Sequence, residues 1–388
     1  MNRLTTSWGS FELARHPQDP RDTLRAWDAA DEYLLRRLHG EVEGPAVPLS
    51  GTVAVLGDRW GALSVSLAAH HPVVQITDSW LGQRATLDNL ARNGVDPETV
   101  RLLTSRDTPP ERIDVLLVRV PKTLSLLQDQ LHRLAPALHE GTVVLGTGMV
   151  REIHTSTLRL FERLIGPTRT SLAVKKARLV SAVPAPQQAA EASPWPLRYD
   201  LPEGIGPLSG RPVTNHAGVF CADRLDVGTR FLLGHLPARS GPEHVVDLGC
   251  GNGVVGTAAA LANPGARVTF ADESFSALAS ARATFRENVP GGEAEFVAGD
   301  ALSALEDASA DLVLTNPPFH SHQATTDATA RRMFADARRV LRPGGELWVV
   351  GNRHLGYHVR LRRLFGSCEV VAGEPRFVVL RAVRRAGR

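Results

Sequence analysis

The sequence predicts an α/β protein of two tandem doubly wound domains, each with parallel strands covered by helices on both faces. Three observations predict this fold: a length of 388 residues, one proline-rich connector, and two halves that repeat the same order of apolar segments. A single hydrophobic core rarely grows beyond ~250–300 residues, so a chain of this length favours two domains.

The connector lies at the middle of the chain. It is rich in proline, alanine and polar residues and shows no apolar period, which predicts a semi-extended linker. We therefore divide the chain into a first domain at 1–183, a linker at 184–197 and a second domain at 198–388.

The repeat consists of four short apolar segments, each expected to be a buried strand followed by a helix. The paired segments are 52–57 with 245–249, 73–78 with 267–272, 113–118 with 310–315, and 141–146 with 345–351. Continuous apolar runs of this length that alternate with helices are typical of parallel sheets. The conserved order indicates an old duplication.

A glycine-rich turn follows the first strand of the second half. The segment expected to hold a nucleoside cofactor comprises Asp247, Gly249, Cys250, Gly251, Asn252 and Gly253. Glycine permits a tight turn and close approach of a ligand, and the next helix directs its N-terminal amides at the same loop. We expect Asp247 to face the cofactor's ammonium end and Cys250 to fill the turn. Such a loop alone could equally mark an NAD site.

Acidic residues end the next two strands. Asp272 and Glu273 stand about twenty residues beyond the loop, where a carboxylate can accept ribose hydroxyls, although Asp272 could also cap a helix. Asp300 is placed to accept from an adenine amino group, with Ala301 offering a backbone amide. Upstream, the residues expected to cover the cofactor's edge are Phe220, Gly228 and Thr229.

The fourth strand is followed by Asn316, Pro317, Pro318 and Phe319, which we predict to be catalytic. Two prolines fix the backbone, so the Pro317 carbonyl and the Asn316 side-chain oxygen can both accept hydrogens from a planar amine. Phe319 would stack on the base. In isolation this motif is only a turn after a strand. Together with the glycine loop it predicts methyl transfer from S-adenosylmethionine, in which Asn316 also borders the cofactor. For His320 the residues favour neither an RNA contact nor a purely structural role.

At these residues the chain resembles the bacterial ribosomal RNA guanine-N2 methyltransferases with tandem domains. The motif at 316–320 is that family's form of the amino-methylase signature, and 215–220, 272–274, 337–339 and 351–355 also match its pattern. The resemblance implies two Rossmann-like class I methyltransferase domains, the second catalytic and the first a degenerate copy that aids RNA binding and folding. It implies ribosomal RNA as partner, with the large-subunit 23S rRNA favoured over 16S rRNA.

The first half of the chain lacks both the glycine loop and the asparagine–proline motif. Arg59 and Trp60 stand where the glycine loop needs bare backbone, so we expect no cofactor there. Arg119 and Lys122 replace the asparagine–proline motif and suit either phosphate contacts or an ordinary charged surface. Nine arginines between 331 and 363 allow the same two interpretations, and their position beside the predicted site favours RNA.

Composition excludes several classes. The net charge is +3, no apolar stretch is long enough to span a membrane, and the N-terminus lacks the apolar core of a signal peptide. Three scattered cysteines offer no metal-ligand spacing, and His354 and His358 lack a third ligand. We expect a cytoplasmic monomer with no metal. An adenine-N6 or glutamine-N5 methylase and a non-catalytic RNA assembly factor remain as alternatives.

Overall fold

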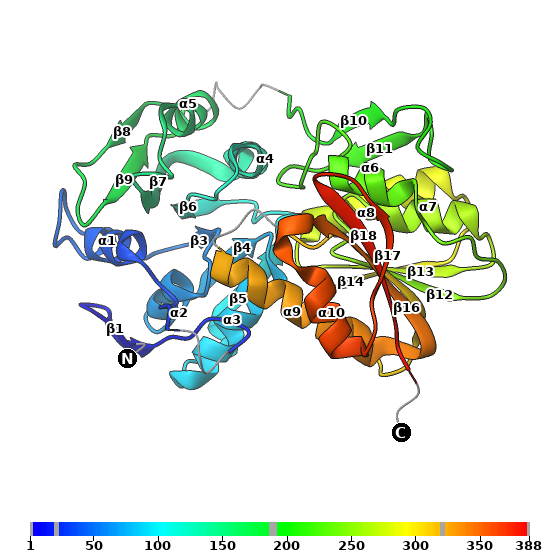
Figure 1. Ribbon diagram of the computed structural model, residues 1–388. Coiled ribbons are helices and arrows are strands. Elements are labelled where there is room, and N and C mark those ends of the chain that lie inside the picture. The colour runs from blue at the N-terminus through cyan, green and yellow to red at the C-terminus, as the bar shows by residue number, and fades with distance from the viewer. Residues whose placement is uncertain (1–2, 19–22, 186–191, 319–322, 386–388) are drawn as a thin grey trace. The chain divides into compact units, whose positions relative to one another are not determined.

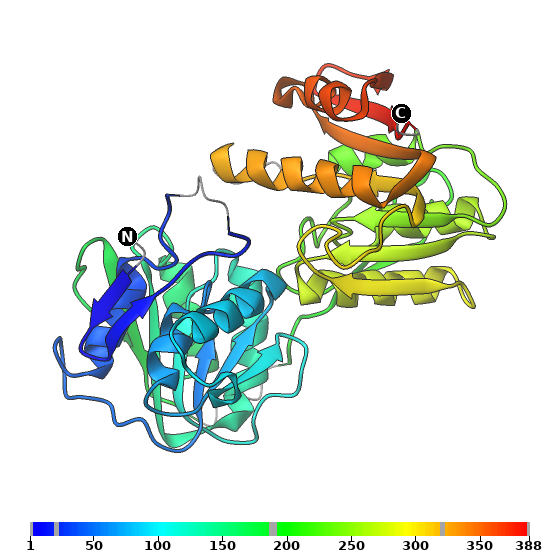
Figure 2. The same ribbon diagram turned by 90° about the horizontal axis from the view of Figure 1, so that it is seen from below.

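The computed structural model describes residues 3–18, 23–185, 192–318 and 323–385. The chain divides into two compact units, Met1–Trp195 and Pro196–Arg388, and each is a sheet of seven strands between two layers of helices (Figure 1). Figure 2 shows the same layers turned by 90°. The last strand of the first unit ends at Ala182 and the first strand of the second begins at Leu197.

The first unit opens with a hairpin and continues as alternating strands and helices. Its elements are β1 (Arg3–Thr6), β2 (Gly9–Glu12), α1 (Ala29–Leu38), β3 (Val53–Leu56), α2 (Ala62–Ala68), β4 (Val73–Thr77), α3 (Trp80–Arg92), η1 (Pro97–Thr99), β5 (Val100–Thr104), β6 (Ile113–Arg119), α4 (Leu124–Leu134), η2 (Ala135–Ala137), β7 (Leu138–Met149), α5 (Thr155–Leu164), β8 (Thr168–Thr170) and β9 (Ala177–Ala182). The strand order is β5-β4-β3-β6-β7-β9-β8.

The second unit repeats this plan after a short β10–β11 hairpin. Its elements are β10 (Leu197–Asp200), β11 (Pro212–Asn215), α6 (Val227–Leu233), β12 (His244–Leu248), α7 (Val254–Ala262), β13 (Arg267–Asp272), α8 (Phe275–Asn288), β14 (Ala294–Ala298), β15 (Ala310–Thr315), α9 (Gln323–Val340), β16 (Leu341–Asn352), η4 (Arg353–Leu355), α10 (Tyr357–Phe365), β17 (Glu369–Gly373) and β18 (Phe377–Val383). The strand order is β14-β13-β12-β15-β16-β18-β17, and β10–β11 form a separate two-stranded sheet.

Alternation along each strand builds the two layers. In the first unit, Val53 and Val55 pack with α1, α2 and α3, whereas Ala54 and Leu56 pack with α4 and α5. In the second unit, Val246 and Leu248 pack with α9 and α10, and Val245 packs with α6, α7 and α8. Both faces of each central strand are therefore buried, which explains why the strands are continuous apolar runs.

The predicted doubly wound fold is confirmed, with one difference at the sheet edge. β12, β13, β14, β15 and β16 are parallel, but β18 runs antiparallel between β16 and β17. A short turn joins β17 to β18, so the two strands form a hairpin and the last must reverse direction. β9 and β8 do the same in the first unit.

The register gives a residue-by-residue correspondence between the units. Leu56 pairs with Val118, and Leu248 pairs with Thr315, each leucine directly preceding the loop after the first parallel strand. Arg119 of the first unit therefore occupies the position of Asn316 in the second.

Candidate active site

The glycine loop and the asparagine–proline motif lie at the ends of neighbouring strands. β12 and β15 pair in parallel, Leu248 opposite Thr315, and the Thr315 hydroxyl donates to the Leu248 carbonyl at 2.7 Å. The chain moves outward from β12 to β13 and β14 and then returns to the other side of β12 with β15. The two motifs thus meet at the point where strand order reverses, which is where open α/β sheets bind ligands.

The loop after β12 is shaped by glycine. Gly249, Gly251 and Gly253 all have positive φ, at 70°, 53° and 77°. A Cβ on Gly253 would lie 2.7 Å from the Ala281 Cα, so only glycine lets α8 pack this closely. A Cβ on Gly251 would meet no atom of the described residues within 4 Å. The loop therefore packs tightly against α8 at Gly253 and faces open space at Gly251, where a cofactor can approach closely.

Asp247 faces the inside of this loop. Its carboxylate accepts from the Gly256 amide at 2.8 Å, and the residue is 2% exposed. Burial, with the charge of Asp272 as a smaller cause, raises the pKa of Asp247 to about 8. The structure places Asp247 as a brace between β12 and the first turn of α7.

Asp272 also holds the loop. One of its carboxylate oxygens accepts from the Gly251 amide at 3.0 Å and the other from the Ser274 amide at 3.0 Å. The alternative role as cap of α8 is wrong, because Ser274 is the N-cap and accepts from the Ala277 amide. Glu273 follows directly at the same strand end.

The end of β14 brings Asp300 and Ala301 to the same edge of the sheet. The Asp300 carboxylate accepts from Arg332 Nε at 3.2–3.3 Å. Ala301 has φ of 49°, a left-handed conformation that costs a residue with a Cβ ~1–2 kcal/mol. Such strain is common at ligand sites.

The structure also places Cys250, Asn252 and Phe220, three further residues that the sequence predicts to lie at the cofactor. Cys250 is buried, and burial raises the pKa of its thiol well above the ordinary value, so the thiol stays protonated. The Asn252 amide donates to the Asn215 side chain at 2.9 Å and ties the loop to β11. Phe220 lies in the turn before α6 and is 51% exposed.

Asn316 is held by the start of α6. Its Nδ2 lies 3.0 Å from an Asp226 carboxylate oxygen and 3.0 Å from the Thr229 hydroxyl oxygen. Its Oδ1 is buried and has no hydrogen-bond partner among the described residues. Gly228 lies against this contact, since a Cβ there would be 3.1 Å from Asp226 and 3.6 Å from Asn316 Nδ2.

The two prolines follow with different exposure: Pro317 is buried and Pro318 exposed. The predictions for Phe319 and His320 fall outside the described residues. Asp226 is a site residue that the sequence prediction did not single out. The available signal was an N-cap aspartate just before the apolar run at 231–233.

Arg119 of the first unit is fully buried, so neither sequence interpretation of it, as a phosphate contact or as a surface charge, is correct. Its guanidinium lies 2.7 Å from Asp28, 3.2 Å from Asp31 and 2.9 Å from Glu152. Burial alone would lower the pKa of Arg119, but these carboxylates hold it above its usual value. Lys122 is exposed.

The loop after β3 also differs from its counterpart. Arg59, at the position of Gly251, pairs with Glu152 at 2.9 Å and with Asp28 at 3.5 Å, so its side chain joins the Arg119 network. Asp58 is buried and accepts from the Gly61 and Ser64 amides. Thr77, not Asp78, stands at the position of Asp272, because Leu56 pairs with Ile76 and Leu248 with Ala271. Asp78 stands instead at the position of Glu273, so the first unit lacks only the carboxylate that holds the glycine loop in the second.

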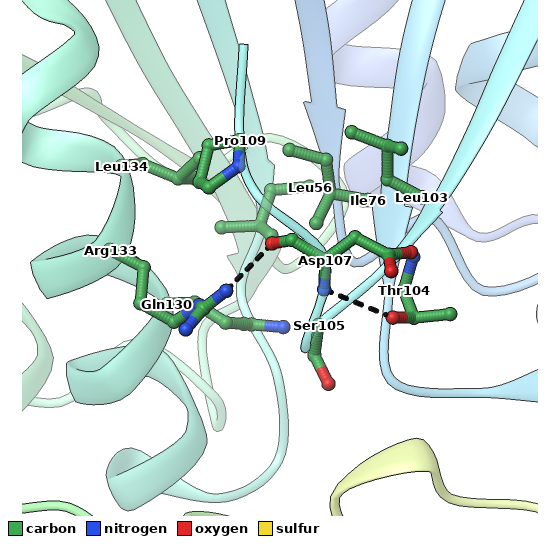
Figure 3. Close-up of a pocket in the computed structure, with 10 residues that line it drawn as sticks. All are labelled: Leu56, Ile76, Leu103, Thr104, Ser105, Asp107, Pro109, Gln130, Arg133 and Leu134. Atoms are coloured by element: carbon green, nitrogen blue, oxygen red, sulfur yellow. Dashed lines mark hydrogen bonds between the residues drawn. The ribbon is translucent and has the colours of Figure 1, made fainter. Parts of the chain in front are cut away.

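Figure 3 shows a cavity at the carboxyl ends of β3, β4 and β5 in the first unit. Its volume is about 10 Å³, room for roughly one water molecule. Arg133 closes it by donating to the Asp107 carbonyl at 2.6 Å, and the Asp107 amide donates to Thr104. A nucleoside cannot fit in this cavity.

The late arginines divide into two sets. Arg332, Arg339 and Arg342 pair with carboxylates of their own unit. A second, exposed set comprises Arg331, Arg338, Arg353, Arg362 and Arg363, joined by Arg376, and the ninth arginine, Arg360, is partly buried. Arg353 follows the carboxyl end of β16, at the edge of the sheet that carries Asn316. Only the second set can offer cations to a polyanion.

The described residues contain neither a metal-ion cluster nor a membrane-spanning helix. No set of three or more histidine, cysteine, aspartate or glutamate side chains is arranged to hold a metal ion. No described helix combines the length and apolar character needed to cross a membrane.

Sheet order, glycine loop and asparagine–proline motif together define a class I methyltransferase. Residues 1–186 match the family described as RLMG N-terminal domain, and residues 210–381 match the methyltransferase small domain. Ribosomal RNA large subunit methyltransferase G of Streptomyces coelicolor is 70% identical, covering 98% of this chain and 100% of the relative. The Pseudomonas aeruginosa protein of the same name is 47% identical, again covering 98% and 100%. The chain belongs to the ribosomal RNA large subunit methyltransferase G family.

A solved structure extends the fold comparison to the whole chain. The 16S rRNA N2 G methyltransferase of T. thermophilus, in complex with AdoMet and guanosine, superposes with a TM-score of 0.73. It is 21% identical, and the match covers 99% of this chain and 97% of that one. This likeness shows that the tandem arrangement of two such domains is shared.

Proposed function

We propose that the second unit methylates the exocyclic N2 amine of a guanine in ribosomal RNA, using S-adenosylmethionine, and that the RNA is 23S rRNA. One observation carries the chemistry: the Asn316 carboxamide donates through its nitrogen, and its buried oxygen has no partner among the residues that the structure describes. A buried acceptor without a donor is costly, so it indicates a ligand that donates.

An exocyclic amine is a weak nucleophile, because its lone pair is delocalised into the ring. An acceptor that bonds an amine hydrogen favours a pyramidal nitrogen and turns the lone pair toward the electrophile. Asn316 Oδ1 supplies this acceptor, and the Pro317 carbonyl is the second. No strong base is needed, since the proton can leave after alkylation. The contribution of these residues is orientation and electrostatics.

The second unit fits the cofactor at the open loop above Gly251. S-adenosylmethionine, when bound, supplies a methyl group on a sulfonium. The residues that would hold it are the backbone from Gly249 to Gly253, with Asp272 and Glu273 at the ribose and Asp300 and Ala301 at the adenine. Asp247 and Asn252 act behind them, by holding the loop.

The relatives' names favour large-subunit RNA. Proteins 45–70% identical over nearly the whole chain carry the name ribosomal RNA large subunit methyltransferase G. The small-subunit alternative rests on the T. thermophilus structure, whose title names 16S rRNA and guanosine, but at 21% identity. The names of these more similar relatives support 23S rRNA as the substrate.

We further propose that the first unit binds no cofactor and supports RNA binding. The small cavity in Figure 3 and the ion network around Arg119 support the first statement. Exposed Lys122 and Arg151, which follow β6 and β7, support the second. Monomeric action in the cytoplasm, where ribosomal RNA is made and assembled, completes the proposal.

Methyl transfer to RNA from a strain lacking this gene tests the function. The protein and radiolabelled S-adenosylmethionine are incubated with naked 23S rRNA, naked 16S rRNA or subunit precursors, and the nucleosides are identified by mass spectrometry. We expect N2-methylguanosine in 23S rRNA. Label in 16S rRNA would favour the small-subunit alternative, and N6-methyladenosine would exclude guanine. A protein that binds the cofactor but labels no RNA would be an assembly factor.

A further inference from the structure

The start of α6 holds the Asn316 amide from two sides. Asp226 and Thr229 both accept from Nδ2 at 3.0 Å, and no described residue contacts Oδ1 within hydrogen-bond distance. Asp226 is itself fixed, because the same carboxylate oxygen accepts from the Thr229 amide at 2.8 Å as the N-cap of α6. Two hydrogen bonds thus lead from a helix end to one nitrogen of the proposed catalytic residue.

The chemistry of Asp226 determines which end of the amide faces the substrate. A carboxylate accepts and cannot donate, so it must face the NH₂ group of Asn316. A flipped amide would place its oxygen against the Asp226 carboxylate and turn two N–H donors toward the substrate. Those donors would repel an amine, whose hydrogens need an acceptor. The Thr229 hydroxyl can donate or accept, so it strengthens the orientation that Asp226 selects.

In the first unit the same three positions, the helix N-cap, the residue three further on and the residue at the strand end, carry different side chains. Asp28 is the N-cap of α1 as Asp226 is of α6, and Asp31 stands three residues later as Thr229 does. Arg119, at the position of Asn316, donates to both Asp28 and Asp31. A guanidinium has hydrogen-bond donors and no acceptor, so Arg119 cannot accept a hydrogen bond from a substrate amine. The contact between helix cap and strand end is therefore a feature of both units. Among the described residues, only the second unit leaves at this position an acceptor oxygen without a partner.

We propose that Asp226 and Thr229 are positioning residues that hold the Asn316 carboxamide with Oδ1 toward the substrate amine. This inference rests on the proposed function. It assigns Thr229 to the orientation of Asn316, whereas the sequence predicts that Thr229 covers the edge of the cofactor. Loss of the contact lets the amide flip, so turnover falls while the affinity for S-adenosylmethionine stays.

Thr229→Val is the sharpest variant, since it is isosteric and keeps the backbone amide that Asp226 caps. We expect kcat on 23S rRNA to fall about five- to tenfold, the effect of losing one ordinary hydrogen bond. The Kd for S-adenosylmethionine should stay within about twofold, and Thr229→Ser should restore most of the rate. Thr284→Val is the matched control, because the Thr284 hydroxyl on α8 bonds the backbone amide and carbonyl of Thr214 and not Asn316. A wild-type rate in Thr229→Val, or a loss of cofactor affinity parallel to kcat, would overturn the assignment.

Asp226→Ser separates the cap from the positioning contact. Serine is as good an N-cap as aspartate, so α6 should persist, but its shorter side chain withdraws the acceptor from Asn316. We expect a larger loss of kcat than in Thr229→Val, with an unchanged melting temperature. Equal rates in Asp226→Ser and wild type would show that the Asp226 carboxylate does not determine the orientation of the Asn316 amide.

A measurement without substrate distinguishes failure of this inference from failure of the proposed function. In NMR spectra of the full chain, the Asn316 side-chain NH₂ signals are assigned by their loss in Asn316→Ala. We expect their hydrogen exchange to be slow in wild type, about fivefold or more faster in Thr229→Val, and unchanged in Thr284→Val. Rapid exchange in wild type would overturn the contact even if RNA is methylated. Slow exchange with no methylation would leave the contact standing and refute the function.

Discussion

Arg119 and Asn316 occupy the same register position in two copies of one fold, and each donates to the acidic N-cap of the helix beside it. Arg119 reaches Asp28 at 2.7 Å, and Asn316 reaches Asp226 at 3.0 Å. The Arg119 guanidinium has only donors, whereas the Asn316 amide has an acceptor oxygen that no described residue bonds. This difference adds to the changed glycine loop in separating the unit that we propose to be catalytic from the first unit.

Replacing Asn316 with alanine removes the acceptor and leaves the glycine loop in place. We expect kcat to fall at least a hundredfold, as for loss of a preorganised group in a site of this kind. The Kd for S-adenosylmethionine, measured by calorimetry, should change less than about threefold, because the loop is held by Asp247 and Asp272. A parallel collapse of affinity would make Asn316 a cofactor ligand first.

Gly251→Arg copies into the second unit the residue that stands at this position in the first. We expect calorimetry on the full chain to give one S-adenosylmethionine per wild-type protein and no binding in the variant. Gly251→Ala has the same backbone φ of 53° but a small side chain, so it should retain binding within about tenfold. Arg59→Gly should leave the stoichiometry at one, since the 10 Å³ cavity and Arg119 remain. A stoichiometry of two in wild type would contradict the inert first unit.

Arg119→Met should destabilise the first unit by about 3–5 kcal/mol at pH 7, because it leaves buried carboxylates without their main partner. Burial raises the pKa of Glu152, but Arg119 and Arg59 lower it to about 2, below its ordinary 4.5. A depressed pKa contributes stability above pH 4.5 that is lost as the pH falls toward 2. The deficit of the variant should therefore shrink as the pH is lowered from 4.5 toward 2.

Denaturant unfolding followed at several pH values measures this effect. Arg36→Met is the control, since the Arg36–Glu41 pair is partly exposed and such pairs contribute less than about 1 kcal/mol. A deficit that is independent of pH would mean that the loss comes from packing and not from charge.

Asp247→Asn tests the buried brace under the loop. Burial raises the pKa of Asp247 to about 8, far above the 3.8 of an unfolded aspartate. The folded chain then holds a proton that the unfolded chain has lost, so this group's stabilisation declines as the pH rises from 4 to 8. Asparagine can still accept from the Gly256 amide but does not titrate. Between pH 6 and pH 9 the variant should gain on wild type by roughly 2–3 kcal/mol, read from denaturation midpoints.

The fold was predictable because it depends on local patterns. Val245 is buried on one face of β12 and Val246 and Leu248 on the other, so the strand appears in the sequence as an apolar run. The loop and Asn316 were also predictable as neighbours, since parallel strands end at one edge of a sheet. The reversal of β18 was not, because a strand's direction leaves no mark on its composition.

The contacts that orient Asn316 could not be predicted from the sequence, for a different reason. Asp226 and Asn316 are ninety residues apart, and no spacing rule connects an N-cap with a strand end. Arg119 was misplaced because a charged residue is buried only when carboxylates surround it, and these come from Asp28, Asp31 and Glu152. Only the folded chain shows that such distant groups meet.

One ion pair is inverted between the units: Arg106 bonds Asp129 in the first, whereas Asp300 bonds Arg332 in the second. Arg106 and Asp300 each follow the edge strand, β5 or β14, by two residues, and their partners lie on α4 and α9. A segment transplanted from one half into the other would confront like charges at this point. An exchange of this segment between the two units would therefore also require a reversal of charge on the helix that faces it.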